Sequence, residues 1–201
     1  PNVGVSFVVS GESYKQINAF MDALAEEQLL EEVYIAFSLL RFLTPAEARR
    51  QNAIDSDFYP MTESSVSHSG LENIDHNDMA AELERLVERF PRDEYQYHFF
   101  PTELNRDNLK AWFSLEDHFF APEVTCIVPW AHCHIMFNGD VVVNGRCCSP
   151  SLGNIMEASL EEIWNGPKAR KFRSKLLELG NYPACNRCCR KLPDKLLHSE
   201  P

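Results

Sequence analysis

All seven cysteines of this 201-residue chain lie between Cys126 and Cys189, and their spacing points to metal chemistry. Cys185 and Cys188 form a C-x2-C pair, whose two thiolates can reach one metal centre from a single turn. Thiolates are soft ligands that suit iron–sulfur clusters, zinc and copper(I). The other ligands must come from elsewhere in the sequence, and Cys126 and Cys147 are the candidates. We therefore predict a thiolate-bound centre, with iron and sulfur as its favoured content.

The cysteines have two other interpretations. A disulfide framework is disfavoured, because the count is odd and the chain opens without the basic and apolar regions of a signal peptide. Zinc also binds C-x2-C pairs, so a structural zinc site at Cys185 and Cys188 is the main alternative. The other three cysteines, Cys133, Cys148 and Cys189, are expected to be buried thiols or thiols without a metal role. Each of them is also a possible substitute for one of the predicted metal ligands.

The histidines that flank Cys133 are not expected to complete a metal site with it. On an extended segment, His132 and His134 share one face while Cys133 points to the other. One centre built from these three residues is therefore disfavoured.

A hairpin and two helices are predicted around the cysteines. Residues 134–137 and 140–143 read as strands joined by Asn138-Gly139, a pair that favours a type I′ turn. Ser159 and Glu162 form a capping box, which opens a short helix. The next helix is expected to start at Pro167 and end at Gly180, five residues before the C-x2-C pair. The hairpin, the helix and the cysteine pair could therefore close around one cluster.

The first half of the chain alternates strands and helices. Apolar runs predict a buried strand at 3–9 and a second strand at 33–40. An apolar stripe predicts a helix that Ser13 could cap, and a capping box with proline predicts another helix from Pro45. A loop is expected over 54–76. Further elements follow in the order helix, strand, helix, at about 79–90, 95–100 and 109–113. Such alternation predicts parallel strands with right-handed crossovers, as in an α/β sheet or barrel.

Charge and hydropathy exclude some partners. The formal net charge of −11 repels phosphate backbones, so nucleic acid is not expected as a partner. No stretch approaches the ~20 apolar residues that span a bilayer, so no membrane association is expected. Clustered thiols that serve as metal ligands are typical of reducing compartments. Together with the lack of a long apolar stretch, this cysteine usage predicts a soluble, cytoplasmic protein.

The segment from Cys126 to Cys189 resembles the C-terminal auxiliary-cluster domain of radical S-adenosylmethionine (SAM) enzymes, the SPASM domain, including its shortened twitch form. Several motifs occur in the family's order, which is more specific than any one of them alone. They are 126–130 (CIVPW), 138–141 (NGDV), 152–155 (LGNI), 159–166 (SLEEIWNG) and the pair Cys185 and Cys188.

This resemblance implies an α/β fold in two parts. Residues 1–120 would be the C-terminal strand–helix units of a partial (βα)6 radical SAM barrel with a linker. Residues 121–201 would be a small α+β SPASM/twitch-like domain, in which a β-hairpin and a helix surround a cluster. One auxiliary 4Fe–4S cluster is implied, with four ligands: Cys126, Cys147, Cys185 and Cys188.

Two positions depart from the family pattern. The family often has a cysteine five positions after the hairpin glycine, but that position is Asn144 here. The second ligand must therefore shift to Cys147 or Cys148. Only Cys189 follows the C-x2-C pair, which favours one auxiliary cluster over two.

The resemblance also implies what this chain would not do alone. The family binds its catalytic 4Fe–4S cluster and SAM through C-x3-C-x2-C, a spacing absent from this sequence. The chain is therefore expected to be the C-terminal part of a parent oxidoreductase whose missing N-terminal part carries that motif. By the resemblance, the parent would use a 5′-deoxyadenosyl radical to modify a peptide, protein or small-molecule substrate. An electron donor such as flavodoxin or ferredoxin would serve it, and the auxiliary cluster would relay electrons or position substrate.

Two alternatives remain beside this interpretation. A degenerate relative would act only as an iron–sulfur electron carrier or docking module. A zinc-stabilised interaction domain would be colourless and redox-inactive. The sequence assigns no catalytic residue.

Overall fold

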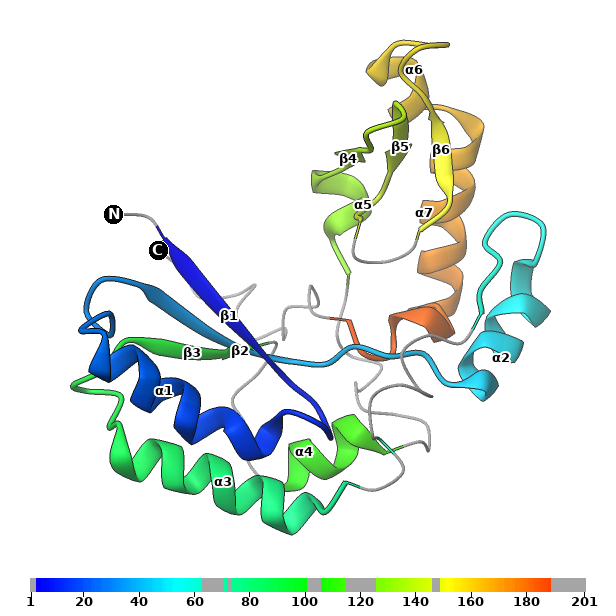
Figure 1. Cartoon of the computed structure of the whole chain (residues 1–201). Coiled ribbons are helices and arrows are strands. Elements are labelled where there is room, and N and C mark those ends of the chain that lie inside the picture. Colours follow the sequence, from blue (N-terminus) through cyan, green and yellow to red (C-terminus); the bar gives the residue numbers. More distant parts are fainter. Residues whose placement is uncertain are drawn as a thin grey trace, which may run out of the picture. The chain divides into compact units, whose positions relative to one another are not determined.

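The computed structural model describes residues 3–62, 71, 74–100, 106–114, 126–145 and 149–188. They form a mixed α/β fold with two compact units (Figure 1). One unit comprises Pro1–Phe42 and Ser64–Phe119, and the other comprises Leu43–Glu63 and Phe120–Pro201. Within the described ranges, no helix is both long and apolar enough to cross a bilayer.

The first unit is built on a parallel sheet, in the order β1 (Gly4–Val9), β2 (Tyr34–Leu39) and β3 (Tyr97–Phe100). Phe7 pairs with Phe37, which pairs with Phe99 on the far side. All three strands lie within the segments expected from the sequence, and their parallel pairing confirms the α/β prediction. The partial (βα)6 barrel remains a prediction.

Helices cover one face of this sheet (Figure 1). They are η1 (Tyr14–Gln16), α1 (Ile17–Glu26), α3 (His76–Arg89) and α4 (Arg106–Phe113). Phe37 is fully buried on the covered face, whereas Ser6 and His98 on the opposite face are exposed. The expectation that the first strand is buried throughout is wrong. Among the described residues, helices pack on one face of the sheet only, so every second side chain of β1 is exposed. Ser13, the expected cap, instead donates its hydroxyl proton to the carbonyl oxygen of Val8.

The helix that follows β2 does not belong to the sheet unit. This helix, α2 (Pro45–Asp55), begins as expected, with Thr44 as its N-cap in a complete capping box and proline at its first turn. Helix α2 groups with the C-terminal part of the chain. Tyr59 lies in the segment expected to be a loop, but it also belongs to this unit and is only 1% exposed. The boundary near residue 120 stays a prediction, but 43–63 packs with the part beyond it. Of the expected loop, 63–70 and 72–73 lie outside the described residues.

The second unit contains an antiparallel sheet and short helices. Its strands are β4 (His134–Ile135), β5 (Asp140–Val142) and β6 (Ser151–Asn154), in that spatial order. Its helices besides α2 are α5 (Val128–Ala131), α6 (Leu160–Trp164), α7 (Pro167–Leu179) and η3 (Pro183–Cys185). The capping box of α6 and the end of α7 at Gly180, where φ is 70°, confirm the sequence-based expectations.

Candidate metal centre

Four of the seven cysteines lie in the described part of the chain. Cys126 precedes α5, Cys133 precedes β4, Cys185 ends η3, and Cys188 follows it. Cys126 and Cys188 are buried, at 8% and 6% exposure, and the other two are half-buried. The remaining three, Cys147, Cys148 and Cys189, lie outside the described residues.

Three of the described cysteines contact one apolar core. Cys126 is part of it, and Cys133 and Cys185 pack against it. The core itself consists of Tyr59, Cys126, Val141, Val143, Leu152, Ile163, Ala169, Phe172, Leu176 and Tyr182. Thiol side chains from distant segments thus converge on a largely dry surface, which suits soft thiolate ligation.

Within the described ranges, no three His, Cys, Asp or Glu side chains are grouped closely enough to hold a metal ion. Each thiolate of a 4Fe–4S cluster binds a different iron, so cluster ligands need not surround a single point. The four-cysteine set remains a prediction, because one of its members lies outside the described residues.

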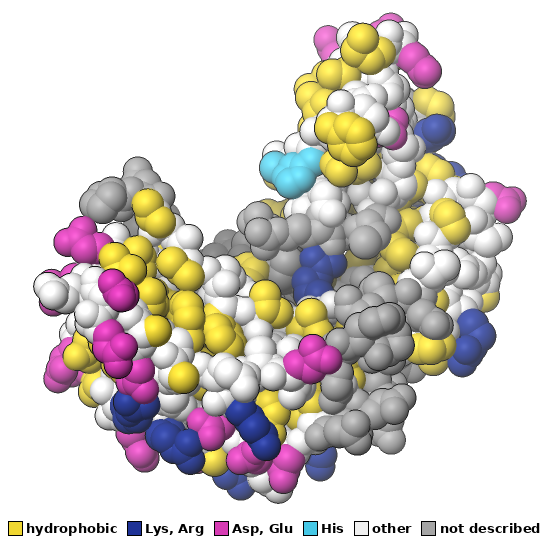
Figure 2. Space-filling view, viewed as in Figure 1, with side chains coloured by type: hydrophobic (Ala, Val, Ile, Leu, Met, Phe, Trp, Pro, Cys, Tyr) yellow, Lys and Arg dark blue, Asp and Glu magenta, His cyan; other side chains and the backbone are white. Residues whose placement is uncertain are grey.

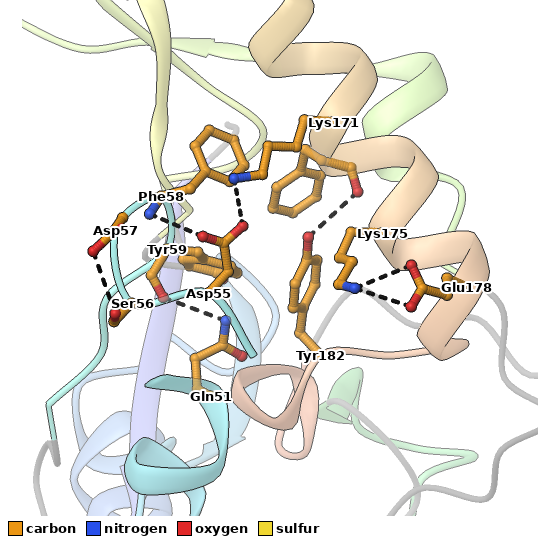
Figure 3. Close-up of polar contacts among 11 residues, drawn as sticks. Gln51, Asp55, Ser56, Asp57, Phe58, Tyr59, Lys171, Lys175, Glu178 and Tyr182 are labelled. Carbon is orange, nitrogen blue, oxygen red and sulfur yellow. Dashed lines mark hydrogen bonds and ion pairs between the residues drawn. The ribbon is translucent and has the colours of Figure 1, made fainter. Parts of the chain in front are cut away.

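Three aromatic rings of this core, those of Tyr59, Phe172 and Tyr182, pack together and form a platform; Figure 3 labels Tyr59 and Tyr182. Cys185 packs against the same core. The Tyr182 ring lies 5.0 Å from Tyr59 and 5.1 Å from Phe172, centroid to centroid. The carbonyl oxygen of Tyr182 accepts a 2.8 Å hydrogen bond from the amide of Cys185. Burial raises the pKa of Tyr182, and the negative charges of Asp55 and Cys185 add to this effect. The phenol therefore stays neutral beside the cysteines.

Helix α2 holds the segment that carries the C-x2-C pair. The side chains of Asn186 and Arg187, which lie between the two cysteines, both donate to Oε1 of Glu47. Gln51 accepts a 3.4 Å hydrogen bond from the amide of Ala184 and donates to the carbonyl oxygen of Tyr59 (Figure 3). Sequence reasoning missed this role, because the sequence marks Glu47 only as a capping residue.

The turn of the hairpin differs from the expected type I′ turn. Met136 pairs with Asp140, and its carbonyl oxygen accepts a hydrogen bond from the amide of Gly139, so 137–139 make a three-residue connection. Only Gly139 has positive φ (86°) there, whereas a type I′ turn also needs it at Asn138. The arrangement is a turn closed by a glycine bulge.

Asp140 ties this turn to β6. Its carboxylate accepts hydrogen bonds from the side chains of Asn138 (2.7 Å), Asn154 (3.1 Å) and Ser151 (3.3 Å). These bonds stabilise the ionised form and hold the pKa of Asp140 below its usual value, with that from Asn138 the strongest. The NGDV and LGNI motifs are therefore linked through their polar side chains.

Replacing Gly139 by alanine is expected to destabilise the second unit by ~1–2 kcal/mol, the cost of left-handed backbone for an L-residue. A Cβ atom there would also lie 2.6 Å from Oδ1 of Asn154. Urea denaturation measures the loss. Gly4→Ala is the matched control, because its Cβ would meet neighbours at an ordinary 3.7 Å. Equal midpoints for Gly139→Ala and the wild type would contradict the expectation.

The described residues on either side of 146–148 are held by hydrogen bonds. The hydroxyl of Ser149 accepts hydrogen bonds from the amides of Val143 (3.0 Å) and Asn144 (3.5 Å). On the other side, Nδ1 of His134 accepts a 3.1 Å hydrogen bond from the amide of Gly145. His134 therefore holds the backbone at Gly145, two positions before Cys147 in the sequence.

His132 and His134 share one side of their segment, as expected. Their rings lie 4.6 Å apart, and His132 has extended backbone angles. Cys133 packs against the core. The alternation of an extended chain thus separates the histidines from the thiol.

The family comparison identifies this region. Residues 126–189 match the family model SPASM, which is described as an iron–sulfur cluster-binding domain. On this match we call residues 126–189 the SPASM domain. The match begins at Cys126 and ends at Cys189, and it contains all seven cysteines.

Two further comparisons add little. A search of curated proteins found no match. Among solved structures, the crystal structure of Streptococcus suis SuiB aligns with a TM-score of 0.46 and 15% identity. The alignment covers 99% of this chain and 43% of SuiB, so this chain spans less than half of that protein. This likeness is too low to support a conclusion.

The SPASM domain exposes apolar side chains around its hairpin (Figure 2). Phe137 is fully exposed, Met156 is 82% exposed and Ile135 is 50% exposed. Nearby, a surface pocket of about 410 Å³ is lined in part by His132 and Trp164. Contiguous exposed apolar surface is typical of interaction sites.

Proposed function

We propose that the SPASM domain holds one auxiliary 4Fe–4S cluster. The ligands would be Cys126, Cys147, Cys185 and Cys188, with Cys148, Cys189 and Cys133 as substitutes. The observation that carries the proposal is the convergence of Cys126 and Cys185 on one apolar core within a segment that matches an iron–sulfur-binding family.

The residues present fit such a group. Cys126 and Cys188 are buried thiols, and thiolates are the usual ligands of a 4Fe–4S cluster. A bound cluster would supply one-electron chemistry. The chain's own part would be to orient the thiolates and exclude water. The apolar core packs against Cys185, and the segment between Gly145 and Ser149 would present Cys147 or Cys148.

The wider role is a proposal of the same kind. The parallel sheet of the first unit would be the C-terminal part of a partial radical SAM barrel, and the parent protein would act by radical chemistry in the cytoplasm. Its substrate would be a peptide, a protein or a small molecule, and flavodoxin or ferredoxin would donate electrons. The exposed apolar side chains around Phe137 support a peptide or protein as the bound species.

The test is anaerobic reconstitution of the full chain, followed by iron and sulfide analysis and a visible absorption spectrum. We expect about four irons and about four sulfides per chain for the wild type, and a loss of both in Cys185→Ala. Leu177→Ala is the control and is expected to keep its iron, because Leu177 is 69% exposed and lies outside the proposed ligand set. Colourless wild-type protein with about one bound zinc would reject the proposal in favour of a structural zinc site.

A further inference from the structure

We propose that Glu47 and Arg187 form a charge pair that positions the cysteine knuckle, residues 185–188, and sets the reduction potential of its cluster. This inference rests on the proposed function. It assigns a role to α2, a helix outside the segment that matches the SPASM family.

The contact between the two side chains is direct and buried. Nη1 of Arg187 lies 2.6 Å from Oε1 of Glu47, and the two side chains are 2% and 1% exposed. Asn186 donates a second hydrogen bond to the same oxygen. Both residues between the ligating cysteines are therefore bound to one carboxylate, which limits the conformations open to the knuckle.

The carboxylate is itself held by its own helix. Its other oxygen, Oε2, accepts a 2.7 Å hydrogen bond from the amide of Thr44, as part of the capping box of α2. One glutamate thus caps a helix with one oxygen and binds the knuckle with the other. This divided use makes Glu47 a positioning residue for Cys185 and Cys188.

Burial gives the pair an electrostatic role as well. Charges in a poorly solvated interior act over longer distances than charges at the surface, because water screens them less. Arg187 lies between Cys185 and Cys188 in sequence, so a cluster bound by these two cysteines would feel the charge of this buried pair. Net charge and hydrogen bonding near the sulfurs are among the factors that set iron–sulfur potentials.

The sign of the effect follows from which charge remains. Reduction adds a negative charge to the cluster. In Glu47→Gln the positive charge of Arg187 loses the carboxylate that faces it, so reduction becomes easier and the potential rises. In Arg187→Gln the carboxylate of Glu47 loses the guanidinium that faces it, so the potential falls. Removing both charges restores the balance and returns the potential towards the wild-type value.

The experiment is a redox titration of the reconstituted full chain, followed by electron paramagnetic resonance of the reduced cluster. We expect each single variant to change the one-electron reduction constant about tenfold, which corresponds to about 59 mV, with opposite signs. The double variant should lie between them. Glu162→Gln is the matched control: Glu162 has the same capping role in α6, binds Ser159 and is exposed, so no shift is expected.

Shifts of the same sign in both single variants, or no shift in either, would overturn the inference. A single variant that takes up no iron is also informative: recovery of iron in the double variant supports a charge pair, and continued loss overturns it. Wild-type protein without iron and sulfide would instead reject the proposed function, so the two failures are distinguishable.

Discussion

Replacing Phe172 by alanine is expected to destabilise the SPASM domain by about 3–5 kcal/mol and to lower its iron content after reconstitution. Phe172 is 4% exposed, and its ring lies 5.1 Å from Tyr182 and 5.7 Å from Tyr59. Truncation would leave a cavity in the platform that supports Cys185. The amide of Cys185 is bonded to Tyr182, so the disturbance would reach the cysteine knuckle.

Urea denaturation of the metal-free protein measures the first effect, and iron analysis of the reconstituted protein measures the second. Trp130 and Trp164 lie in the SPASM domain and report its unfolding by fluorescence. Leu177→Ala is the matched control, because Leu177 lies on the same helix but is 69% exposed, so a change within about 0.5 kcal/mol is expected. Equal unfolding midpoints for the two variants would contradict the role of the platform.

The second large effect is expected in the parallel sheet. Phe37→Ala should destabilise the first unit by about 3–5 kcal/mol, because it removes the central ring of an aromatic cluster. Phe37 is fully buried, and its ring lies within 5.6–5.9 Å of Phe7, Tyr97 and Phe99. Every strand of the sheet contributes to this cluster, so the loss affects all three strands.

Hydrogen exchange of the amides in β1, β2 and β3 measures this loss directly. Tyr34→Ala is the matched control: it truncates an aromatic side chain on the same strand, but one that is 56% exposed. Tyr34 stacks on His98 at 5.2 Å, so about 1 kcal/mol or less should be lost. Equal protection of the sheet in both variants would contradict the prediction.

Local features of the fold were predictable from the sequence. The capping boxes at Thr44 and Ser159 and the stop of α7 at Gly180 depend on hydrogen bonds and backbone angles within a few residues. The alternation of His132, Cys133 and His134 depends only on extended backbone. The type of the hairpin turn was not predictable, because Asn-Gly fits both a two-residue turn and a glycine bulge.

Contacts between segments far apart in the sequence could not be predicted in the same way. The sequence does not show that α2 leaves the sheet unit or that Tyr59 enters the core of the SPASM domain. The bond between Glu47 and Arg187 joins residues 140 positions apart, and no local pattern marks it. Such contacts depend on which buried groups must find partners once the core has formed.

The sequence by itself therefore determined the chemistry: clustered thiols, their C-x2-C spacing and the motifs of an iron–sulfur domain follow from residue type and order. Only the tertiary structure decided the surroundings of those thiols. It placed Cys185 against a core with an aromatic platform and a buried carboxylate against Arg187, because burial and charge pairing arise from residues that are distant in the chain.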